Sequence, residues 1–430
     1  VDDRMDERTA APAPGARLGL HGWLDPPVLG IALVMAAAGF AQFSPAAALA
    51  DVAEHFGRLR DGDTVAEQAG LPGTVLGTGL AAIRLSALAA LPLAGLADRW
   101  GRRRSMLTWA TLGLLAVVTA AASPGYWWFV ALFALARPLL TATDTVGEVM
   151  AAEHTSVHDR ARAIALMSAA YGLGAGAVAV LRAVLGSGLG FRAVFALSLL
   201  PLGLVAVAAR RVTEPARFGA ATAVRPAPVL GAVQSGRRGR LAALAGLAFA
   251  SGLVTGPANT LLFVYAENVL DVSTAVTGAL VVAAAPAGLA GLVAGRYLSD
   301  RVGRRPTAAV ALVALCGAGV VTYLGPVPAL VAGYLIGVLV GAAYATPAIA
   351  LAAELFPTSA RASVAGWLVV AGVLGASSGL LLAGAVADAT GSFGAAMAWV
   401  CIPAALAAVL LAAVPETRGR ELEETAPEAG

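Results

Sequence analysis

The stretch "LADRWGRRR" (Leu96–Arg104) places four arginines in one short turn between two long apolar segments. A close copy, "LSDRVGRR" (Leu298–Arg305), lies between two later apolar segments, and Asp98 and Asp300 are 202 residues apart. A second pair of stretches, "AAEHTSVHDRA" and "AAELFPTSARA", places Glu153 and Glu354 201 residues apart. Two independent motifs share nearly the same offset, so the chain is predicted to consist of two repeated halves.

The composition indicates a membrane protein. Of the 430 residues, 59% are hydrophobic and only 13% are charged, whereas soluble globular domains carry roughly 25% charged residues. Apolar runs of about 20 residues recur along the chain, and each is long enough to cross a bilayer as a helix. The alternating pattern of a membrane β-barrel is absent from the sequence. We therefore expect an all-α membrane protein with twelve transmembrane helices: 28–50, 73–97, 105–123, 126–150, 163–185, 191–209, 241–265, 274–297, 307–325, 328–352, 363–387 and 394–414.

The arginines predict the orientation of these spans. If the amino terminus is cytoplasmic, only Arg58, Arg60 and Arg192 fall in loops on the other side of the membrane, and nearly all the remaining loop arginines are cytoplasmic. Positive residues are enriched in cytoplasmic loops, so both termini are expected there, in a multi-pass protein of the cell (inner) membrane. The net charge of +3 is small and does not suggest a nucleic-acid partner.

The spans divide the chain into five parts. We expect a cytoplasmic tail (1–27), an amino-terminal six-helix bundle (28–209), a cytoplasmic linker (210–240), a carboxy-terminal six-helix bundle (241–414) and a second cytoplasmic tail (415–430). The two bundles have parallel topology and are pseudo-symmetric. Repeated halves of this kind are typical of secondary transporters, whose substrate site lies between the halves near the middle of the membrane.

The chain resembles the major facilitator superfamily over nearly its full length. The family's Gly-x-Leu-x-Asp-Arg-x-Gly-Arg-Arg signature fits twice, except that Ala94 and Arg296 replace its first glycine. An arginine within span 4, Arg137, resembles a second family signature. The segments "TEPARF" (Thr213–Phe218) and "PETRGRELEE" (Pro415–Glu424) resemble those that close the halves of sugar porters and related metabolite:proton symporters. The glycine-proline signature of drug:proton antiporters is not evident in span 5.

This resemblance implies a secondary active transporter that works by alternating access. The expected activity is proton-coupled uptake (symport) of a small organic metabolite, either an organic anion or a sugar-like solute, and the alternative is proton-driven efflux of drugs or a secondary metabolite. No nucleotide-binding loop, metal-ligand cluster or nucleophile–base pair is evident, so we expect neither enzymatic activity nor a cofactor or metal. The expected partners are the substrate, protons and the lipid bilayer, and the protein is expected to be a monomer.

The arginine turns are predicted to form a cytoplasmic gate. Asp98 and Asp300 end their helices beside these arginines, so salt bridges between them can form. We expect such bridges to hold the cytoplasmic side shut in the outward-open state and to break when that side opens. The alternative is that the arginines only enforce topology. The gate candidates are Asp98, Arg99, Gly101, Arg102, Arg103, Glu148, Glu153, Arg160, Asp300, Arg301, Gly303, Arg304, Arg305, Glu354 and Arg361.

Charges within the spans are the candidates for coupling. Arg137, Asp144 and Glu148 recur at helical spacing in "FALARPLLTATDTVGEVM" and share one helix face, and intramembrane charges are expensive and commonly functional. Asp144 is the expected proton carrier, with Arg137 beside it. The alternative is a structural Arg137–Asp144 ion pair that locks the helix.

Five residues are candidates for substrate binding. Arg84 lies near the middle of span 2, where it either faces the substrate or pairs with Asp144. Arg84, Arg137 and Arg182 outnumber the acids of the amino-terminal half's interior, which favours an anionic solute. The other candidates are polar or aromatic residues of spans 1, 7 and 10, each with packing as its alternative role: Gln42, Phe43, Asn259 and Tyr344.

Overall fold

The structure is a computed structural model that describes residues 21–59, 62, 64–156, 158–185, 190–215, 238–420 and 425. Three of the expected parts are described only in part. Residues 1–20 of the first tail, 216–237 of the linker, and 421–424 and 426–430 of the second tail lie outside the described residues. The described chain is mostly helical with short connections, and its one β-bridge among the described residues joins His21 and Thr155.

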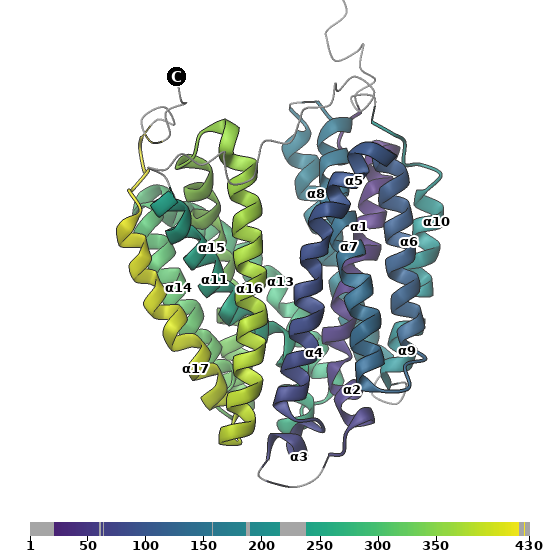
Figure 1. Ribbon diagram of the computed structural model, residues 1–430, viewed down its shortest axis with the longest axis vertical. Helices are drawn as coiled ribbons and strands as arrows, with labels where there is room; N and C mark the ends of the chain where they lie inside the picture. Colours follow the sequence, from purple (N-terminus) through teal and green to yellow (C-terminus); the bar gives the residue numbers. More distant parts are fainter. Residues whose placement is uncertain are drawn as a thin grey trace, which may run out of the picture.

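Two groups of long helices stand side by side (Figure 1). The first group contains α1 (Pro26–Ala47), α2 (Leu49–Phe56), α3 (Val65–Ala69), α4 (Gly73–Ser86), η2 (Ala87–Ala89), α5 (Ala90–Trp100), α6 (Arg102–Ala120), α7 (Tyr126–His154), α8 (Arg160–Leu185), α9 (Gly190–Ala196) and α10 (Leu199–Ala208). The second contains α11 (Arg238–Thr260), α12 (Leu262–Val264), the π-helix η6 (Tyr265–Val269), α13 (Thr274–Arg301), α14 (Arg304–Thr322), α15 (Val327–Glu354), α16 (Thr358–Thr390), α17 (Phe393–Leu406) and η7 (Ala407–Ala413).

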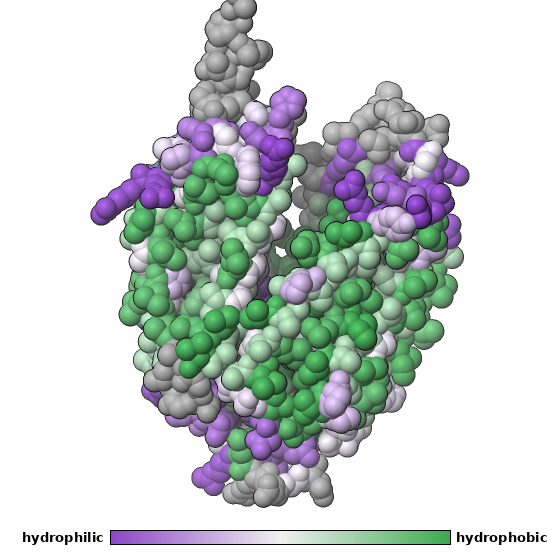
Figure 2. All heavy atoms as spheres, turned by 180° about the vertical axis from the view of Figure 1, so that it is seen from behind, coloured by the Kyte–Doolittle hydropathy of each residue, from purple (hydrophilic) through white to green (hydrophobic). Residues whose placement is uncertain are grey.

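The predicted spans are confirmed. Within the described residues, eleven helical stretches are long and apolar enough to cross a membrane. The twelfth is α6, which has 19 residues but opens with three arginines and is therefore less apolar. Large apolar side chains such as Leu173, Val310 and Val409 are exposed on the outer surface, and an apolar band covers the flank of the molecule between hydrophilic ends (Figure 2). Such a band suits the hydrocarbon core of a bilayer.

The two arginine turns lie at one end of the molecule, which we call the arginine-turn end. Gly101 joins α5 to α6 with a φ of 93°, and Gly303 joins α13 to α14 with a φ of 125°. L-residues with side chains avoid this backbone region, so the repeated glycine of the motif is explained by the turn it makes. The described residues that follow η7 also lie at this end, in the upper part of Figure 1.

The two halves contact each other through α4 with α16 and through α8 with α13. Small residues allow these helices to approach closely. A side chain at Gly77 would collide with the backbone of Leu380, and one at Gly278 would collide with Ala183. Glycine contacts of this kind are common between membrane helices. At the upper, arginine-turn end a hollow separates the lobes, whereas they meet at the opposite end, which we call the far end (Figure 2).

Candidate functional site

A cavity of about 660 Å³ lies between the two halves and is called the main cavity. Arg84, Ala87 and Arg137 line it from the first half. The second half supplies most of its wall from α11, α15 and α16, with Arg361, Ala352 and Ala353 toward the arginine-turn end: Leu244, Leu247, Ala248, Ser251, Gly252, Thr255, Ala308, Tyr344, Ala345, Ala348, Ile349, Leu351, Ala352, Ala353, Arg361, Ala365, Leu368, Val369, Gly372, Val373, Ala376 and Leu411. The volume is in the usual range for binding a small organic molecule.

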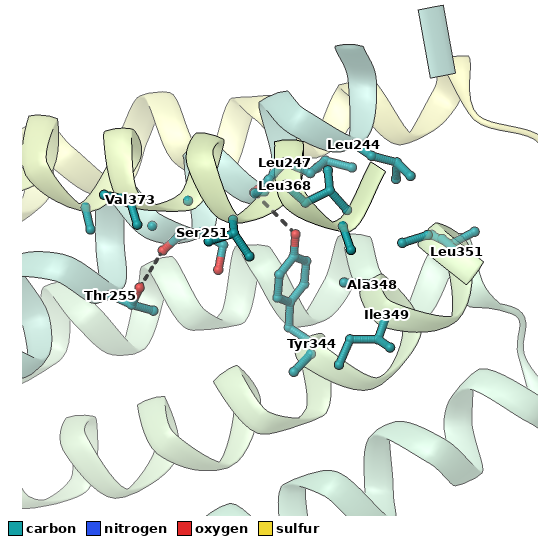
Figure 3. A pocket seen from close by; sticks show the side chains of 18 of the residues that line it. Leu244, Leu247, Ser251, Thr255, Tyr344, Ala348, Ile349, Leu351, Leu368 and Val373 are labelled. Carbon is teal, nitrogen blue, oxygen red and sulfur yellow. Dashed lines mark hydrogen bonds between the residues drawn. The ribbon is translucent and has the colours of Figure 1, made fainter. Parts of the chain in front are cut away.

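The second-half wall is mostly aliphatic, and two of its three hydroxyl groups are tied to backbone carbonyls (Figure 3). The Tyr344 hydroxyl donates to the Leu247 carbonyl at 3.3 Å, and Thr255 donates to the Ser251 carbonyl at 3.0 Å. The Tyr344 ring therefore packs α15 against α11 and presents an aromatic surface to the cavity. The structure places Tyr344 in the main cavity, as a substrate-binding residue would require.

The two arginines of the first half enter the cavity without a carboxylate partner. Arg84 makes a single long contact, 3.5 Å from its Nη2 to Thr260 Oγ1 of α11. The Nε atom of Arg137 is buried and has no hydrogen-bond partner. Among the described residues neither guanidinium forms an ion pair within 4.0 Å, and the two lie close enough to repel each other.

Asp144 lies on the same helix as Arg137, but its hydrogen bond goes to α1. Gln42 Nε2 donates to Asp144 Oδ2 at 2.6 Å, and Asp144 Oδ1 is buried without a partner. The structure thus shows neither the locking Arg137–Asp144 ion pair nor the Arg84–Asp144 pair that the sequence left open. Asp144 is instead held by the hydrogen bond from Gln42, which joins α1 to α7. Gln42 therefore does not line the main cavity.

Tyr171 of α8 belongs to the same group, although it was not among the candidates selected from the sequence. It lies within electrostatic range of Arg84, Arg137 and Asp144. An aromatic hydroxyl in the middle of a span otherwise rich in glycine and alanine is the only signal that marks it. Arg84, Arg137, Asp144, Gln42 and Tyr171 together are called the charged cluster.

Two substrate candidates do not line the main cavity. Phe43 packs edge-to-face on Phe263 of α12, with ring centroids 6.0 Å apart, and lines neither of the two cavities described here. Asn259 lines a second cavity of about 340 Å³ between α11, α14 and α15, with Tyr334 and Thr322. Its side-chain nitrogen donates to the Thr255 carbonyl at 3.1 Å.

The arginine turns hold ion pairs that stay within each half. Arg102 pairs with Asp98 at 3.1 Å and also with Glu153. The second half repeats this set, because Arg304 pairs with Asp300 at 3.4 Å and with Glu354 at 3.3 Å.

The other gate candidates do not join these ion pairs. Arg160 and Arg361 donate to the carbonyls of Ala152 and Phe356 instead of pairing with Glu153 and Glu354. Arg301 stacks on the Tyr297 ring, and no described residue pairs with the exposed Glu148. The remaining candidates, Arg99, Arg103 and Arg305, likewise form no ion pair with a described residue.

Two glutamates that the sequence did not select complete these sets. Glu214 accepts from the backbone N–H groups of Arg102 and Arg103 at 2.7 and 3.0 Å. Glu416 accepts from those of Arg304 and Arg305 at 2.9 and 3.0 Å. A carboxylate at a helix N-terminus satisfies free donors and complements the helix dipole. The two glutamates are 202 residues apart, the offset already seen for Asp98 and Asp300, so this offset was the signal that could have identified them.

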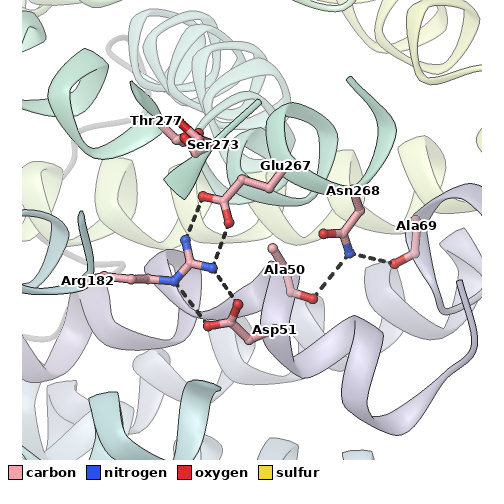
Figure 4. Close-up of polar contacts among 8 residues, drawn as sticks. All are labelled: Ala50, Asp51, Ala69, Arg182, Glu267, Asn268, Ser273 and Thr277. Carbon is pink, nitrogen blue, oxygen red and sulfur yellow. Dashed lines mark hydrogen bonds and ion pairs between the residues drawn. The ribbon is translucent and has the colours of Figure 1, made fainter. Parts of the chain in front are cut away.

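The far end is closed by a buried set of charges that joins the halves, called the far-end gate (Figure 4). Arg182 of α8 donates to Asp51 of α2 at 3.1 and 2.6 Å and to Glu267 of η6 at 2.6 and 2.7 Å. Only 2% of the Arg182 side chain is exposed. Arg182 therefore contributes no free positive charge to the interior, which corrects the charge balance expected from the sequence.

Polar contacts to backbone reinforce this closure. Asn268 of η6 donates to the carbonyls of Ala50 and Ala69 at 3.2 and 3.0 Å. Asp388 of α16 accepts from the N–H groups of Gly73 and Thr74 at 2.6 and 2.8 Å and thereby caps α4 of the other half. The far end is thus shut by bonds between the halves, whereas the ion pairs of the arginine turns do not cross between them.

The model of the Major Facilitator Superfamily matches residues 29–298 and 283–429. No curated protein has a significant sequence match to the chain.

Several solved structures share the fold. The D-xylose-proton symporter is 20% identical, with a TM-score of 0.70 over 92% of this chain and 99% of that one. The nucleoside transporter NupG is 12% identical, with a TM-score of 0.68 over 90% and 98%. The human organic anion transporter MFSD10 (TETRAN) is 19% identical, with a TM-score of 0.61 over 90% and 99%. At these identities the likeness establishes the fold alone.

Proposed function

Since the chain belongs to the Major Facilitator Superfamily and is a transporter rather than an enzyme, we propose that it carries a small organic solute by proton-coupled alternating access. The observation that carries this proposal is the asymmetry of the main cavity. Its far end is sealed by Arg182 and Glu267, which come from different halves, while its other end lies below the hollow between the lobes (Figure 2). Rocking of the two halves about the cavity would open the far end and close the arginine-turn end.

We place the protein in the cell membrane as a monomer, with the arginine turns and both termini in the cytoplasm. The distribution of arginines supports this orientation. The conformation is then inward-open, and the far end faces the outside. In the outward-open state the exposed acids Asp98 and Asp300 would meet the opposite half and close the cytoplasmic side.

Asp144 is the residue we assign to proton coupling. It is an acid within the membrane, one of its oxygens has no partner, and it forms no ion pair with a described residue. Arg137, two turns away on α7, lies within electrostatic range of it. Protonation of Asp144 would change the net charge of the cluster whose two arginines line the cavity, so the proton and the solute would influence each other's binding.

Proteoliposomes test both the direction and the coupling. A candidate solute is loaded against an imposed pH gradient, and its accumulation is compared with exchange at equal pH. We expect accumulation of solute with protons, and Asp144→Asn should abolish accumulation while leaving exchange intact. Glu54→Gln, which removes an exposed acid of α2 outside the charged cluster, is the control and should behave like the wild type.

Two outcomes would contradict parts of this proposal. If Asp144→Asn still concentrates solute, the assignment of the proton site is wrong. If the imposed gradient drives solute out in exchange for protons, the protein is an exporter, and the uptake direction is wrong.

A further inference from the structure

The described lining of the main cavity has a one-sided charge. Arg84, Arg137 and Arg361 line it, and no aspartate, glutamate or histidine does. An unpaired cation in the membrane interior is costly. Because Arg84 and Arg137 have no ion-pair partner among the described residues, the site lacks a counter-charge that a ligand would supply.

The charge balance indicates how many negative charges the ligand carries. Within the charged cluster, Arg84 and Arg137 supply two positive charges, and Asp144 is the single acid. Glu148 lies within electrostatic range of Asp144 but is exposed, and Arg361 lies toward the arginine-turn end, where it donates to the Phe356 carbonyl. Arg182, the third arginine of the membrane interior, is fully engaged by Asp51 and Glu267. The cluster therefore has an excess of one positive charge, which a single anionic group neutralises.

The opposite wall excludes a strongly polar body for the ligand. It consists mainly of alanine, leucine, valine and isoleucine side chains, with Leu247, Ala348 and Leu368 around the Tyr344 ring (Figure 3). No asparagine, glutamine or tryptophan is among its described residues, and the Tyr344 and Thr255 hydroxyls already donate to backbone carbonyls, which leaves Ser251 as its single other hydroxyl. A polyhydroxylated solute would lose its hydrogen bonds to water at such a wall without replacing them.

We propose that the main cavity binds an amphipathic organic anion with one negative charge. Its anionic group lies on Arg84 and Arg137, and its apolar body lies against Leu247, Ala348 and Leu368. This inference rests on the proposed function in one respect, namely that the main cavity is the transport site. It narrows the solute class to organic anions and removes sugars from it.

Equilibrium binding in lipid nanodiscs tests the inference without requiring transport. The probe is radiolabelled 3-phenylpropionate, with octanoate and indole-3-acetate as further carboxylates. Three competitors each remove one feature: 3-phenylpropanamide has no charge, gluconate has no apolar body, and xylose has neither. We expect the carboxylates to compete with the probe, and the three controls to compete at least about tenfold less well, as for the loss of one charge-assisted contact.

Variants locate the site. Arg84→Gln and Arg137→Gln should each weaken binding of 3-phenylpropionate by about tenfold or more, and Arg84→Lys should retain part of the affinity because it keeps the charge. Ala348→Trp should abolish binding by filling the apolar side. Arg192→Gln, an arginine outside the cavity, is the matched control and should bind like the wild type.

The possible results separate this inference from the proposed function. Equal competition by the amide and the acid, or binding of xylose and of none of the carboxylates, would overturn the inference and leave transport intact. Carboxylates that bind as expected but do not cross proteoliposomes would support the inference and contradict the transport function. Unchanged binding in both glutamine variants would show that the anion does not use these arginines and would also overturn it.

Discussion

Arg182 and Glu267 join the two halves of the molecule through two hydrogen bonds, Nη1 to Oε1 at 2.6 Å and Nη2 to Oε2 at 2.7 Å. The same guanidinium also holds Asp51 of its own half. One positive charge therefore lies between two carboxylates, and the gate as a whole carries one negative charge. The three residues are consequently not equivalent, and their substitution should open the far end to different degrees.

Arg182→Gln should open the far end most, because it leaves two carboxylates facing each other across the interface. Glu267→Gln should have an intermediate effect, since it removes the ion pair between halves but leaves a neutral Arg182–Asp51 pair. Asp51→Asn should have the least effect, because Arg182 and Glu267 still bind each other. The measurement is labelling of Thr255→Cys in the main cavity by an impermeant maleimide added from the far-end side. We expect Arg182→Gln to shift the conformational equilibrium by at least about tenfold, or ~1.4 kcal/mol.

Two controls accompany this order. Glu54→Gln removes an exposed acid from α2 and should leave labelling unchanged. The double variant Arg182→Gln/Glu267→Gln removes one of the opposed carboxylates and should label less than Arg182→Gln alone. If the three single variants label equally, or if Asp51→Asn labels most, charge pairing at this gate does not hold the far end closed.

Gly379→Ala should destabilise the second half. A side chain at this position on α16 would collide with the backbone of Leu253 on α11, and overpacking typically costs about 1–3 kcal/mol. The measurement is the midpoint of thermal unfolding in detergent. Gly366→Ala on the same helix has no atom near the added methyl group, and it should be neutral or slightly stabilising because alanine favours helices. Equal midpoints for the two variants would contradict the close approach of α11 and α16.

Glu416 should stabilise the fold in a pH-dependent way. Partial burial raises the pKa of its carboxyl, but four backbone N–H groups outweigh this effect and hold the pKa below its usual value. A lowered pKa in the folded state gives stability that is present above the pKa of the unfolded chain and is lost as the pH falls through the folded value. We expect Glu416→Gln to cost about 1 kcal/mol at pH 7, as for a helix-capping group that is partly exposed.

The cost of Glu416→Gln should therefore shrink as the pH falls below the ordinary glutamate pKa of about 4.3 and on through the lowered pKa of the folded state, where the wild-type carboxyl becomes protonated. Chemical unfolding in detergent at pH 7 and at the lowest pH at which the protein stays soluble measures it. A cost that is constant over this range would show that the negative charge of Glu416 does not support the amino terminus of α14.

Much of the fold could be predicted because it depends on local patterns. The apolar runs fixed twelve spans, and the repeated Asp98 and Asp300 motifs indicated two halves, since membrane spans need long apolar segments wherever they occur in a sequence. Most described helices begin or end a few residues beyond the prediction. α16, for example, runs from Thr358 to Thr390, whereas the span was expected at 363–387, because helices continue past the apolar core.

The far-end gate could not be predicted because it depends on contacts between distant segments. Asp51 and Glu267 lie near the ends of spans, where an acid usually meets water, and nothing local shows that Arg182 lies between them. The charged cluster was predicted in part: Arg84 and Arg137 do line the cavity. The partner of Asp144 was not predicted, because spacing along α7 pointed to Arg137, while the nearest donor, Gln42, comes from α1.

The central claim is that the two halves rock about the main cavity, so that closure at one end accompanies opening at the other. Pairs of spin labels can follow both ends in a protein whose buried cysteines, Cys316 and Cys401, are replaced by alanine. Glu54→Cys with Ala389→Cys reports on the far end. A second pair, Arg162→Cys with Arg418→Cys at two exposed positions, reports on the arginine-turn end.

The most direct measurement is the pair of distance distributions by double electron–electron resonance, with and without Arg182→Gln. We predict that the distance at the far end increases in the variant while the distance at the arginine-turn end decreases. Distances that both increase, or a far end that opens while the arginine-turn end does not change, would contradict rocking of two rigid halves about a shared cavity.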